Sequence, residues 1–198
     1  VGYGSKSFAG ESYSGIFRSM YKYADDICEN DNVLELSKKA DIIFTATPQG
    51  FLAENINDEV LANAKVIDLS ADFRIKDVDV YEKWYKLEHK SKGLIKEAVY
   101  GLPELYREEI KKARLIANPG CYPTCSILSL QPLLKHKLID KNSIIIDAKS
   151  GTSGAGRSGK VDNLFCEVNE NMKAYGIGSH RHTPEIRLKM KSRGYPFP

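Results

Sequence analysis

The chain has 198 residues, of which 42% are hydrophobic and 28% charged, which is enough to bury the core of one or two globular domains. Its 29 lysines and arginines against 26 aspartates and glutamates leave a net charge of +3, which argues against a nucleic-acid partner or an anionic membrane. No apolar stretch approaches the roughly 18 residues that a membrane-spanning helix needs. Four irregularly spaced cysteines do not make a disulfide framework, so we expect a reducing, cytoplasmic location.

Short apolar runs alternate with helical patterns along the chain. The near-continuous apolar run at 41–47 predicts a strand buried on both faces of a parallel sheet. In chain order, we then expect a helix at 51–64, a strand at 65–69, a helix at 79–88 with Val80, Trp84 and Leu87 on one face, a helix from Pro103 to Lys112, a strand at 114–117, a helix at 123–136 that Pro132 kinks or restarts, and a strand at 143–148. This alternation predicts a doubly wound α/β fold with a largely parallel, Rossmann-like sheet, and a second, glycine-rich region after a boundary near 118–123.

Polar or glycine residues stand where three of the predicted strands end. They lie in the segments 47–50, 70–74 and 118–121. Because ligands of doubly wound folds bind beyond the carboxyl ends of the strands, we expect these segments to form one cleft.

Cys121 follows a Pro-Gly turn at the expected start of a helix, near Pro123. Unpaired N–H groups and the helix dipole favour negative charge there, so the thiol is a candidate nucleophile, with a buried structural cysteine as the alternative. Cys125 should share a helix face with Cys121, and buried packing explains it better than a metal pair. Cys28 and Cys166 have no partner pattern and are predicted to be structural.

The segment 180–186 places two histidines, an arginine and a glutamate close together in the sequence. Thr183 suits the cap of a helix whose first residue is Pro184, and the segment then offers a proton donor and an anion clamp. A metal-binding His-x-His pair and a solvated helix start are the alternatives. His89 and His136 lie among lysines and are expected to be exposed.

Two further segments suit phosphate groups. The small residues of 150–157 form a loop whose backbone N–H groups can approach phosphate, with a plain flexible loop as the alternative. Ser5-Lys6-Ser7 follows a possible strand end at 1–3, and cationic and hydroxyl groups at that point favour NADP over NAD.

These motifs together resemble one enzyme family over almost the whole chain. The similarity is carried by the segments 118–124, 150–157 and 180–186, supported by 7–10, 67–74 and 99–104. They resemble N-acetyl-γ-glutamyl-phosphate reductase of arginine biosynthesis, a relative of aspartate-semialdehyde dehydrogenase. The sister family usually has asparagine before its cysteine, so Gly120 favours the arginine-pathway enzyme.

The resemblance implies an NADPH-dependent reduction of an acyl phosphate through a thioester on a cysteine. It implies an NADP-binding domain at 1–120, the start of an α+β substrate and dimerisation domain at 121–198, and a homo-oligomer (dimer or tetramer) without metal. Carried onto this sequence, the resemblance gives four catalytic residues: Cys121, Glu185 and, as acid/base, His182 as first choice and His180 as second. The substrate-binding residues that it implies are Arg74, Arg181, Asn118 and Ser150. The cofactor-binding residues that it implies are Ser5, Lys6, Ser7, Pro48, Ser70, Ser153 and Gly154.

The chain departs from the family at some points. Cys125 stands where a small Gly or Ala is expected. A family member opens with a strand and a glycine-rich phosphate turn and continues well past segment 180–186, so we expect a chain cut at both ends. An aspartate-semialdehyde dehydrogenase-like enzyme, a reductase of a carrier-bound amino-acid phosphate and a non-catalytic fragment are the alternative functions, and a cysteine hydrolase is a weaker one.

Overall fold

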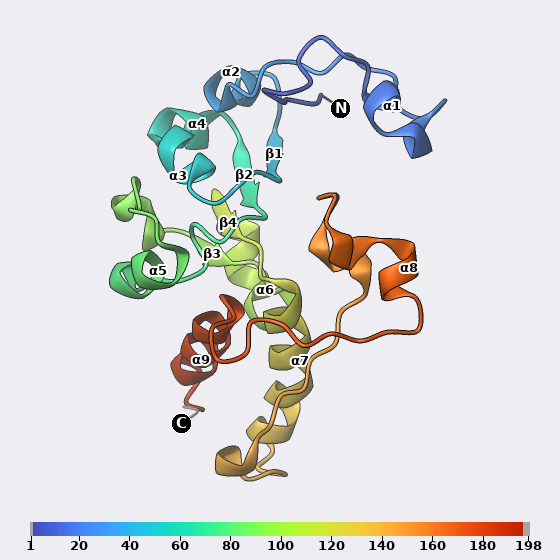
Figure 1. The fold of residues 1–198 in the computed structure, drawn as a ribbon. Coiled ribbons are helices and arrows are strands. Elements are labelled where there is room, and N and C mark those ends of the chain that lie inside the picture. The colour runs from blue at the N-terminus through green and yellow to red at the C-terminus, as the bar shows by residue number, and fades with distance from the viewer. Residues whose placement is uncertain (1, 196–198) are drawn as a thin grey trace. The chain divides into compact units, whose positions relative to one another are not determined.

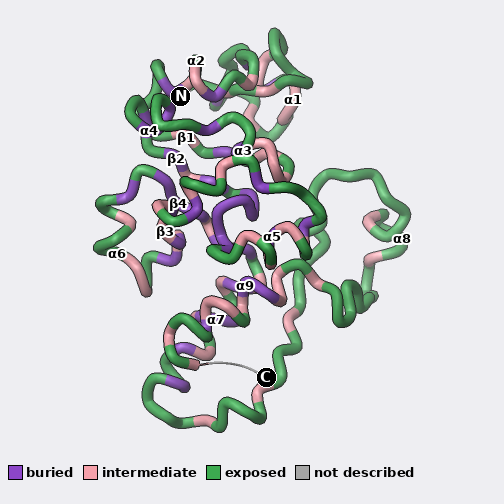
Figure 2. The backbone as a smooth tube through the Cα atoms, turned by 90° about the vertical axis from the view of Figure 1, so that its left-hand side faces the viewer, coloured by how far each residue is buried: buried purple, intermediate pink, exposed green. Residues whose placement is uncertain are grey.

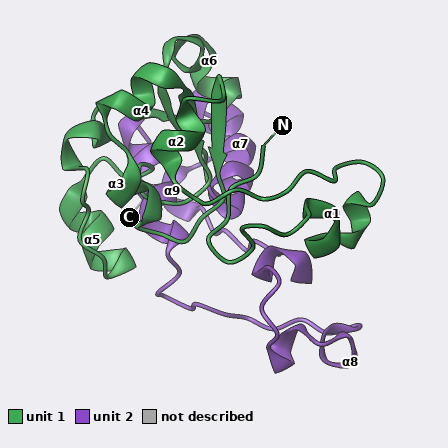
Figure 3. Ribbon diagram, turned by 90° about the horizontal axis from the view of Figure 1, so that it is seen from above, with its two compact units in different colours: residues 1–119 green, residues 120–198 purple. Residues whose placement is uncertain are grey.

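A computed structural model describes residues 2–195 of the chain. It divides into two compact units, unit 1 at residues 1–119 and unit 2 at residues 120–198 (Figure 3). Of the strand end expected at 1–3, Val1 lies outside the described residues, and the part that is described forms no strand. Gly4, just after it, makes an isolated parallel bridge to Glu29.

Unit 1 is built on a four-stranded sheet in which every pair of neighbouring strands is parallel (Figure 1). The strands are β1 (Ile42–Thr45), β2 (Lys65–Asp68), β3 (Val99–Tyr100) and β4 (Leu115–Ala117), in the order β1-β2-β4-β3. Parallel pairing brings the carboxyl ends of all four strands to one edge of the sheet. This confirms the predicted α/β fold with a parallel sheet.

The helices of unit 1 connect these strands. They are α1 (Tyr13–Ile16), α2 (Val33–Ser37), α3 (Phe51–Asn55), α4 (Asp58–Asn63), α5 (Val78–Tyr85) and α6 (Pro103–Lys112), with short 3₁₀ turns at Arg18–Met20 and Lys92–Ile95. The single helix expected at 51–64 is wrong, because Ile56 is extended (ψ 140°) and the Asn57 side chain accepts the N–H of Val60 to cap a new helix. Helix α6 begins at Pro103, as predicted.

The buried face of α5 differs from the expected one. Tyr81 and Tyr85 are its buried residues, with stacked rings 5.0 Å apart, whereas Leu87 lies beyond the helix and is exposed. Lys86 ends α5 in a left-handed conformation (φ 58°), which turns the chain before Leu87 can continue the helical face.

The core of unit 1 lies between the sheet and helices α3 and α4 (Figure 2). Its fully buried members include Leu52, Val60, Val66 and Leu115. The expectation that 41–47 is buried on both faces is wrong for Ile42 and Phe44, which are 50% and 67% exposed. Within the described residues β1 is an edge strand, so it has a neighbouring strand on one side only.

The described part of unit 2, residues 120–195, contains three α-helices: α7 (Cys121–Lys135), α8 (Phe165–Val168) and α9 (His182–Ser192). Short 3₁₀ turns lie at Lys141–Ser143, Thr152–Ala155 and Val161–Asn163. Helices α7 and α9 pack together, and α7 runs through Pro132 as one element instead of restarting there. The strand expected at 143–148 is absent. No described segment pairs with it, and Ile145 is 91% exposed.

Among residues 2–195, no helix combines the length and the apolar character needed to cross a membrane.

Candidate active site

Cys121 opens helix α7 and is exposed to solvent. The residue before it, Gly120, is extended (φ −67°, ψ 160°), and its carbonyl accepts the first helical N–H, from Thr124, at 2.9 Å. Thr124 Oγ1 donates to the same carbonyl at 2.9 Å. Pro123 has no N–H, so the amides that precede the first helical hydrogen bond are those of Cys121 and Tyr122.

Two residues of α9 hold Gly120. Its N–H donates to Oε1 of the fully buried Glu185 at 3.2 Å. Its α-carbon lies against the ring of His182, because a Cβ at position 120 would be 2.5 Å from Nε2 and 2.7 Å from Cε1. Only a residue without a side chain allows the imidazole so close to the residue before the thiol. Unit 2 therefore places His182 and Glu185 against Gly120, the residue before Cys121, and the catalytic roles expected of Cys121, His182 and Glu185 stay predictions.

His180 lies beside His182, with ring centroids 5.0 Å apart. The backbone N–H of His182 donates to Nδ1 of His180 at 3.1 Å, so that nitrogen carries a lone pair and the neutral ring bears its proton on Nε2. Burial, and then the charge of Arg181, lower the pKa of His180 from its usual 6.5. These contacts favour His180 as a neutral imidazole that offers an N–H.

A pair of tyrosines borders the two histidines. Tyr175 Oη donates to Tyr122 Oη at 2.8 Å, and both rings meet His180 edge-on at 5.2 Å. Burial, the Tyr122 hydroxyl and the nearby Cys121 thiol raise the pKa of Tyr175 to about 12. Gly176 makes the turn with a positive φ of 60° and leaves only 3.1 Å between a Cβ position and the His180 ring. No local motif marks either tyrosine as a member of this group. Their distance from each other along the chain hides the contact.

The segment around Thr183 begins differently from the expectation. Helix α9 starts at His182, after Arg181, and neither Thr183 as a cap nor Pro184 as the first residue is correct. The N–H of Thr183 donates to the carbonyl of His180 at 2.9 Å, and the helix begins two residues earlier than expected. His182 thereby gains a fixed backbone at the first helical position.

In unit 1, the ends of β1 and β2 are tied by a buried carboxylate. Asp68 accepts hydrogen bonds from Thr45 Oγ1 at 3.0 Å, from the N–H of Ser70 at 2.9 Å and from its hydroxyl at 2.8 Å. Burial raises the pKa of Asp68, and the Ser70 and Thr45 hydrogen bonds partly offset this rise. Ser70, expected at the cofactor, is itself buried, so its contacts support a positioning role for that residue.

Arg74 joins the ends of β2 and β4. Its Nε donates to the carbonyl of Asn118 at 2.6 Å and its Nη2 to the carbonyl of Leu69 at 2.7 Å. The residue is only 6% exposed. These contacts support a positioning role, and the predicted substrate roles of Arg74 and Asn118 stay predictions.

Asp72, which follows β2, fixes the loop that follows the neighbouring strand β1. Its carboxylate accepts the N–H of Gly50 at 2.8 and 3.0 Å, the N–H of Ala53 at 3.2 Å and the hydroxyl of Tyr81 at 2.8 Å. Gly50 has a positive φ of 90°, which suits a glycine at the start of α3. Asp72 thus fixes the loop that contains Pro48, a role that its place in the predicted strand-end segment 70–74 does not indicate.

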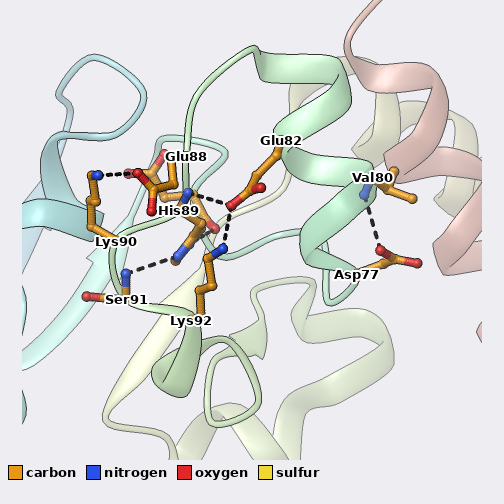
Figure 4. Close-up of polar contacts among 9 residues, drawn as sticks. Asp77, Val80, Glu82, Glu88, His89, Lys90, Ser91 and Lys92 are labelled. Carbon is orange, nitrogen blue, oxygen red and sulfur yellow. Dashed lines mark hydrogen bonds and ion pairs between the residues drawn. The ribbon is translucent and has the colours of Figure 1, made fainter.

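The expectation that His89 is exposed is wrong: the residue is 1% exposed. Its Nε2 lies 2.7 Å from the carbonyl of Asp72, and its Nδ1 accepts the N–H of Ser91 at 3.2 Å, so Nε2 is the protonated nitrogen. Two charged residues near His89, Glu82 and Lys92, form an ion pair with each other. Glu82 also accepts the backbone N–H of His89 (Figure 4). Burial lowers the pKa of His89.

The remaining predicted residues lie on open surface. Lys6, Ser7 and Pro48 in unit 1 are exposed, as are Ser150, Ser153, Gly154 and Arg181 in unit 2, and Ser5 is half-buried. The buried packing expected for Cys125 and the structural role expected for Cys166 are wrong, because both residues are exposed. Cys28 is buried, as predicted, and His136 is exposed, as predicted. Within residues 2–195, no group of three or more His, Cys, Asp or Glu side chains is arranged to hold a metal ion.

An open hollow of about 520 Å³ lies elsewhere in unit 1, lined in part by Asn57, Ser91 and Glu97. It does not include the strand-end residues described above.

Comparison with known proteins gives two adjoining family matches. Residues 1–113 match the semialdehyde dehydrogenase NAD-binding domain, and residues 121–195 match the semialdehyde dehydrogenase dimerisation domain. The chain is 63% identical over 186 residues to an N-acetyl-gamma-glutamyl-phosphate reductase of Lachnoclostridium phytofermentans, which covers 94% of this chain and 54% of the relative. Proteins of the same name from Lachnospira eligens and Campylobacter jejuni are 60% and 59% identical, over 94% and 92% of this chain and 54% and 52% of their own lengths.

These matches confirm the resemblance inferred from the sequence motifs. The chain spans about half the length of the curated relatives that it matches. The two family matches together extend from residue 1 to residue 195, so the chain belongs to the semialdehyde dehydrogenase family.

Proposed function

We propose that this protein reduces N-acetyl-γ-glutamyl phosphate to N-acetylglutamate semialdehyde and inorganic phosphate, with NADPH as the reductant. The observation that carries the proposal is the packing of His182 against Gly120, directly before the exposed Cys121, with Glu185 bound to the same glycine. A thiol, an imidazole and a buried carboxylate around one backbone turn suit acyl transfer to sulfur. The relatives described above bear the name of this reductase.

In the first step, the Cys121 thiolate attacks the acyl carbon of the acyl phosphate. A carbon–sulfur bond forms, the carbon–oxygen bond to phosphorus breaks, and phosphate leaves with the bonding electrons. Negative charge develops on the acyl oxygen, and the amides of Cys121 and Tyr122 at the start of α7 are suitable donors to it. The product of this step is a thioester on Cys121.

When bound, NADPH supplies hydride to the thioester carbon. His182 then protonates the resulting alkoxide, and later removes that proton so that the aldehyde leaves and the Cys121 thiolate is regenerated. His180 is less suited to this exchange, because Nδ1 accepts the backbone N–H of His182 and a lowered pKa keeps the ring neutral. We therefore assign the acid/base role to His182 and a hydrogen-bonding role to His180.

Glu185 acts through the backbone. Its Oε1 accepts the N–H of Gly120 and so fixes the peptide that precedes the nucleophile. This contact favours a positioning role for Glu185 over direct contact with substrate.

The residues at the strand ends of unit 1 fit a dinucleotide. The hydroxyl of Thr47, beside Pro48, is buried and has no hydrogen-bond partner within the described residues, which leaves a polar atom at the place where doubly wound folds bind their cofactor. Lys6 and Ser7 are exposed and suit a 2′-phosphate. We propose that Lys6, Ser7 and Pro48 in unit 1 contact NADP, together with Ser153 and Gly154 of unit 2.

We further propose that the protein is a homo-oligomer of the cytoplasm. The match of residues 121–195 to a dimerisation domain supports self-association, as do apolar side chains left open in unit 2, such as Phe165 (81% exposed) and Ile177 (85% exposed). All four cysteines are free thiols, which suits a reducing compartment.

The direct test is NADPH oxidation by the purified protein with N-acetyl-γ-glutamyl phosphate, compared with aspartyl phosphate. We expect turnover with the first substrate, its loss in Cys121→Ser with NADPH binding retained, and normal turnover in the matched control Cys166→Ser. A folded protein that prefers aspartyl phosphate, or that keeps its activity in Cys121→Ser, overturns the proposal.

A further inference from the structure

Two thiols lie near each other at the start of α7. Cys121 is its first residue and Cys125 follows four positions later, so their side chains stand one above the other on a single helix face. Both are exposed, whereas Cys28 is buried in unit 1. The proposed reaction uses Cys121 and leaves Cys125 without a role.

We propose that Cys121 and Cys125 form an oxidative modification site, in which Cys125 converts the oxidised nucleophile into a reversible disulfide. The inference shares the reactive Cys121 thiol with the proposed function, but it does not depend on the acyl phosphate or on NADPH. The oxidant is hydrogen peroxide or another small hydroperoxide.

The oxidation takes two steps. The Cys121 thiolate attacks a peroxide oxygen, the oxygen–oxygen bond breaks, and Cys121 becomes a sulfenic acid while hydroxide leaves. The Cys125 thiol then attacks the Cys121 sulfur, the sulfur–oxygen bond breaks, and the oxygen leaves as water. Two thiols have together lost two electrons and two protons, and one hydrogen peroxide has become two water molecules.

The helix geometry makes this disulfide labile. Residues four apart on a helix have Cβ atoms about 5–6 Å apart, and a disulfide needs about 3.5–4.5 Å. Closing the bridge therefore distorts the first turn, where Gly120 is already extended and Pro123 contributes no N–H. A strained, exposed disulfide is easily reduced, so the oxidised nucleophile is recoverable by thiols instead of proceeding to sulfinic acid.

The test uses the purified protein, hydrogen peroxide and mass spectrometry. Trypsin cuts after Arg114 and Lys135, so both cysteines fall in one peptide, and Cys166 falls in another. After peroxide and alkylation, we expect the 115–135 peptide to be unalkylated and lighter than the reduced peptide by two hydrogen atoms. Dithiothreitol should restore two alkylated thiols and, in parallel, the reductase activity.

Cys125→Ala is the informative variant and Cys166→Ala the matched control. In Cys125→Ala, Cys121 should gain two oxygens as sulfinic acid and fail to recover with dithiothreitol, whereas Cys166→Ala should behave like the unchanged protein. If the unchanged protein and Cys125→Ala reach sulfinic acid at the same rate, or if Cys121 links to Cys166, the inference is overturned. An inactive protein that still forms the bridge contradicts the proposed function alone, and an active protein that forms none contradicts this inference alone.

Discussion

The α-carbon of Gly120 and the imidazole of His182 are in direct contact, with room for no side chain between them. This contact joins the residue before Cys121, the proposed nucleophile, to the first residue of α9. The backbone of Gly120 does not require glycine, because its φ of −67° is accessible to any residue. The contact with His182 does require it, because a side chain at position 120 would overlap the imidazole.

Substitution of Gly120 by alanine should therefore displace the His182 ring. We expect Gly120→Ala to lower kcat by at least tenfold and the free energy of unfolding by about 1–3 kcal/mol, the usual cost of overpacking. Steady-state kinetics and urea unfolding measure the two effects. Gly93→Ala is the matched control, because a Cβ there meets no atom within 4 Å, and it should change neither value appreciably. A fully active Gly120→Ala variant would contradict the prediction, because it would show that the His182 ring can move without loss of activity.

Removal of the Tyr175 hydroxyl should weaken the support of His180. Tyr175→Phe keeps the ring and loses the hydrogen bond to Tyr122, so we expect kcat/KM to fall by about three- to tenfold, the value of one ordinary hydrogen bond. Tyr122→Phe should have the same effect, and the double variant should be no worse than either single one. Tyr23→Phe, at a residue 86% exposed, is the control. Additive losses would mean that the two hydroxyl groups act separately.

Asp72 should be a strong determinant of stability in unit 1. An amide at this position turns one acceptor oxygen into a donor facing the N–H groups of Gly50 and Ala53, so we expect Asp72→Asn to cost about 3 kcal/mol. Urea unfolding of the protein measures the change. The exposed Asp79 is the control, and Asp79→Asn should lie within about 0.5 kcal/mol of the unchanged protein. If Asp72→Asn and Asp79→Asn change the free energy of unfolding equally, Asp72 is not a strong determinant of stability.

Stability should fall in mild acid because of His89. Burial lowers the pKa of His89 in the folded protein below the usual 6.5. Below pH 6.5 the unfolded chain therefore binds a proton that the folded protein does not bind, and this favours unfolding. This contribution is fully present above pH 6.5 and is lost as the pH falls toward the folded-state pKa. Glu82 and Lys92, the charged neighbours, act in opposite directions on the same ring.

The measurement is the free energy of unfolding at several pH values from above 6.5 downward. His89→Gln keeps an N–H for the carbonyl of Asp72 but cannot be protonated, so its acid-induced loss should be smaller than that of the unchanged protein. His136→Gln, at an exposed residue, should follow the unchanged protein. If the free energy of unfolding falls equally with pH in all three proteins, His89 is not the cause of the loss of stability in acid.

The parallel sheet could be predicted because its strands are short, apolar and separated by helical patterns. Cys121 and segment 180–186 could be singled out because both are distinctive in themselves, and the structure packs His182 of that segment against Gly120, the residue before Cys121, while their catalytic roles stay predictions. The strand expected at 143–148 was wrong because a strand needs a partner, and apolar residues alone do not supply one. The sequence does carry a signal for the break at Asn57, since an asparagine followed directly by Asp58 and Glu59 suits the start of a helix.

Other features depend on contacts that no local pattern contains. His89 is surrounded in sequence by charged residues, but its Nε2 is bound to the carbonyl of Asp72, 17 positions away. The Tyr122–Tyr175 pair spans 53 positions. Side chains of this kind are identified by the fold, because their partners become neighbours only when distant segments meet.

The contacts of Arg74 have a consequence for the way in which unit 1 can open. Asn118 is bound at both of its backbone groups, since its N–H donates to the carbonyl of Asp68 at 2.8 Å and its carbonyl accepts from Arg74. The same guanidinium also donates to the carbonyl of Leu69, directly after β2. One side chain therefore couples the ends of β2 and β4, so that neither strand can fray from its carboxyl end without breaking a hydrogen bond of the other.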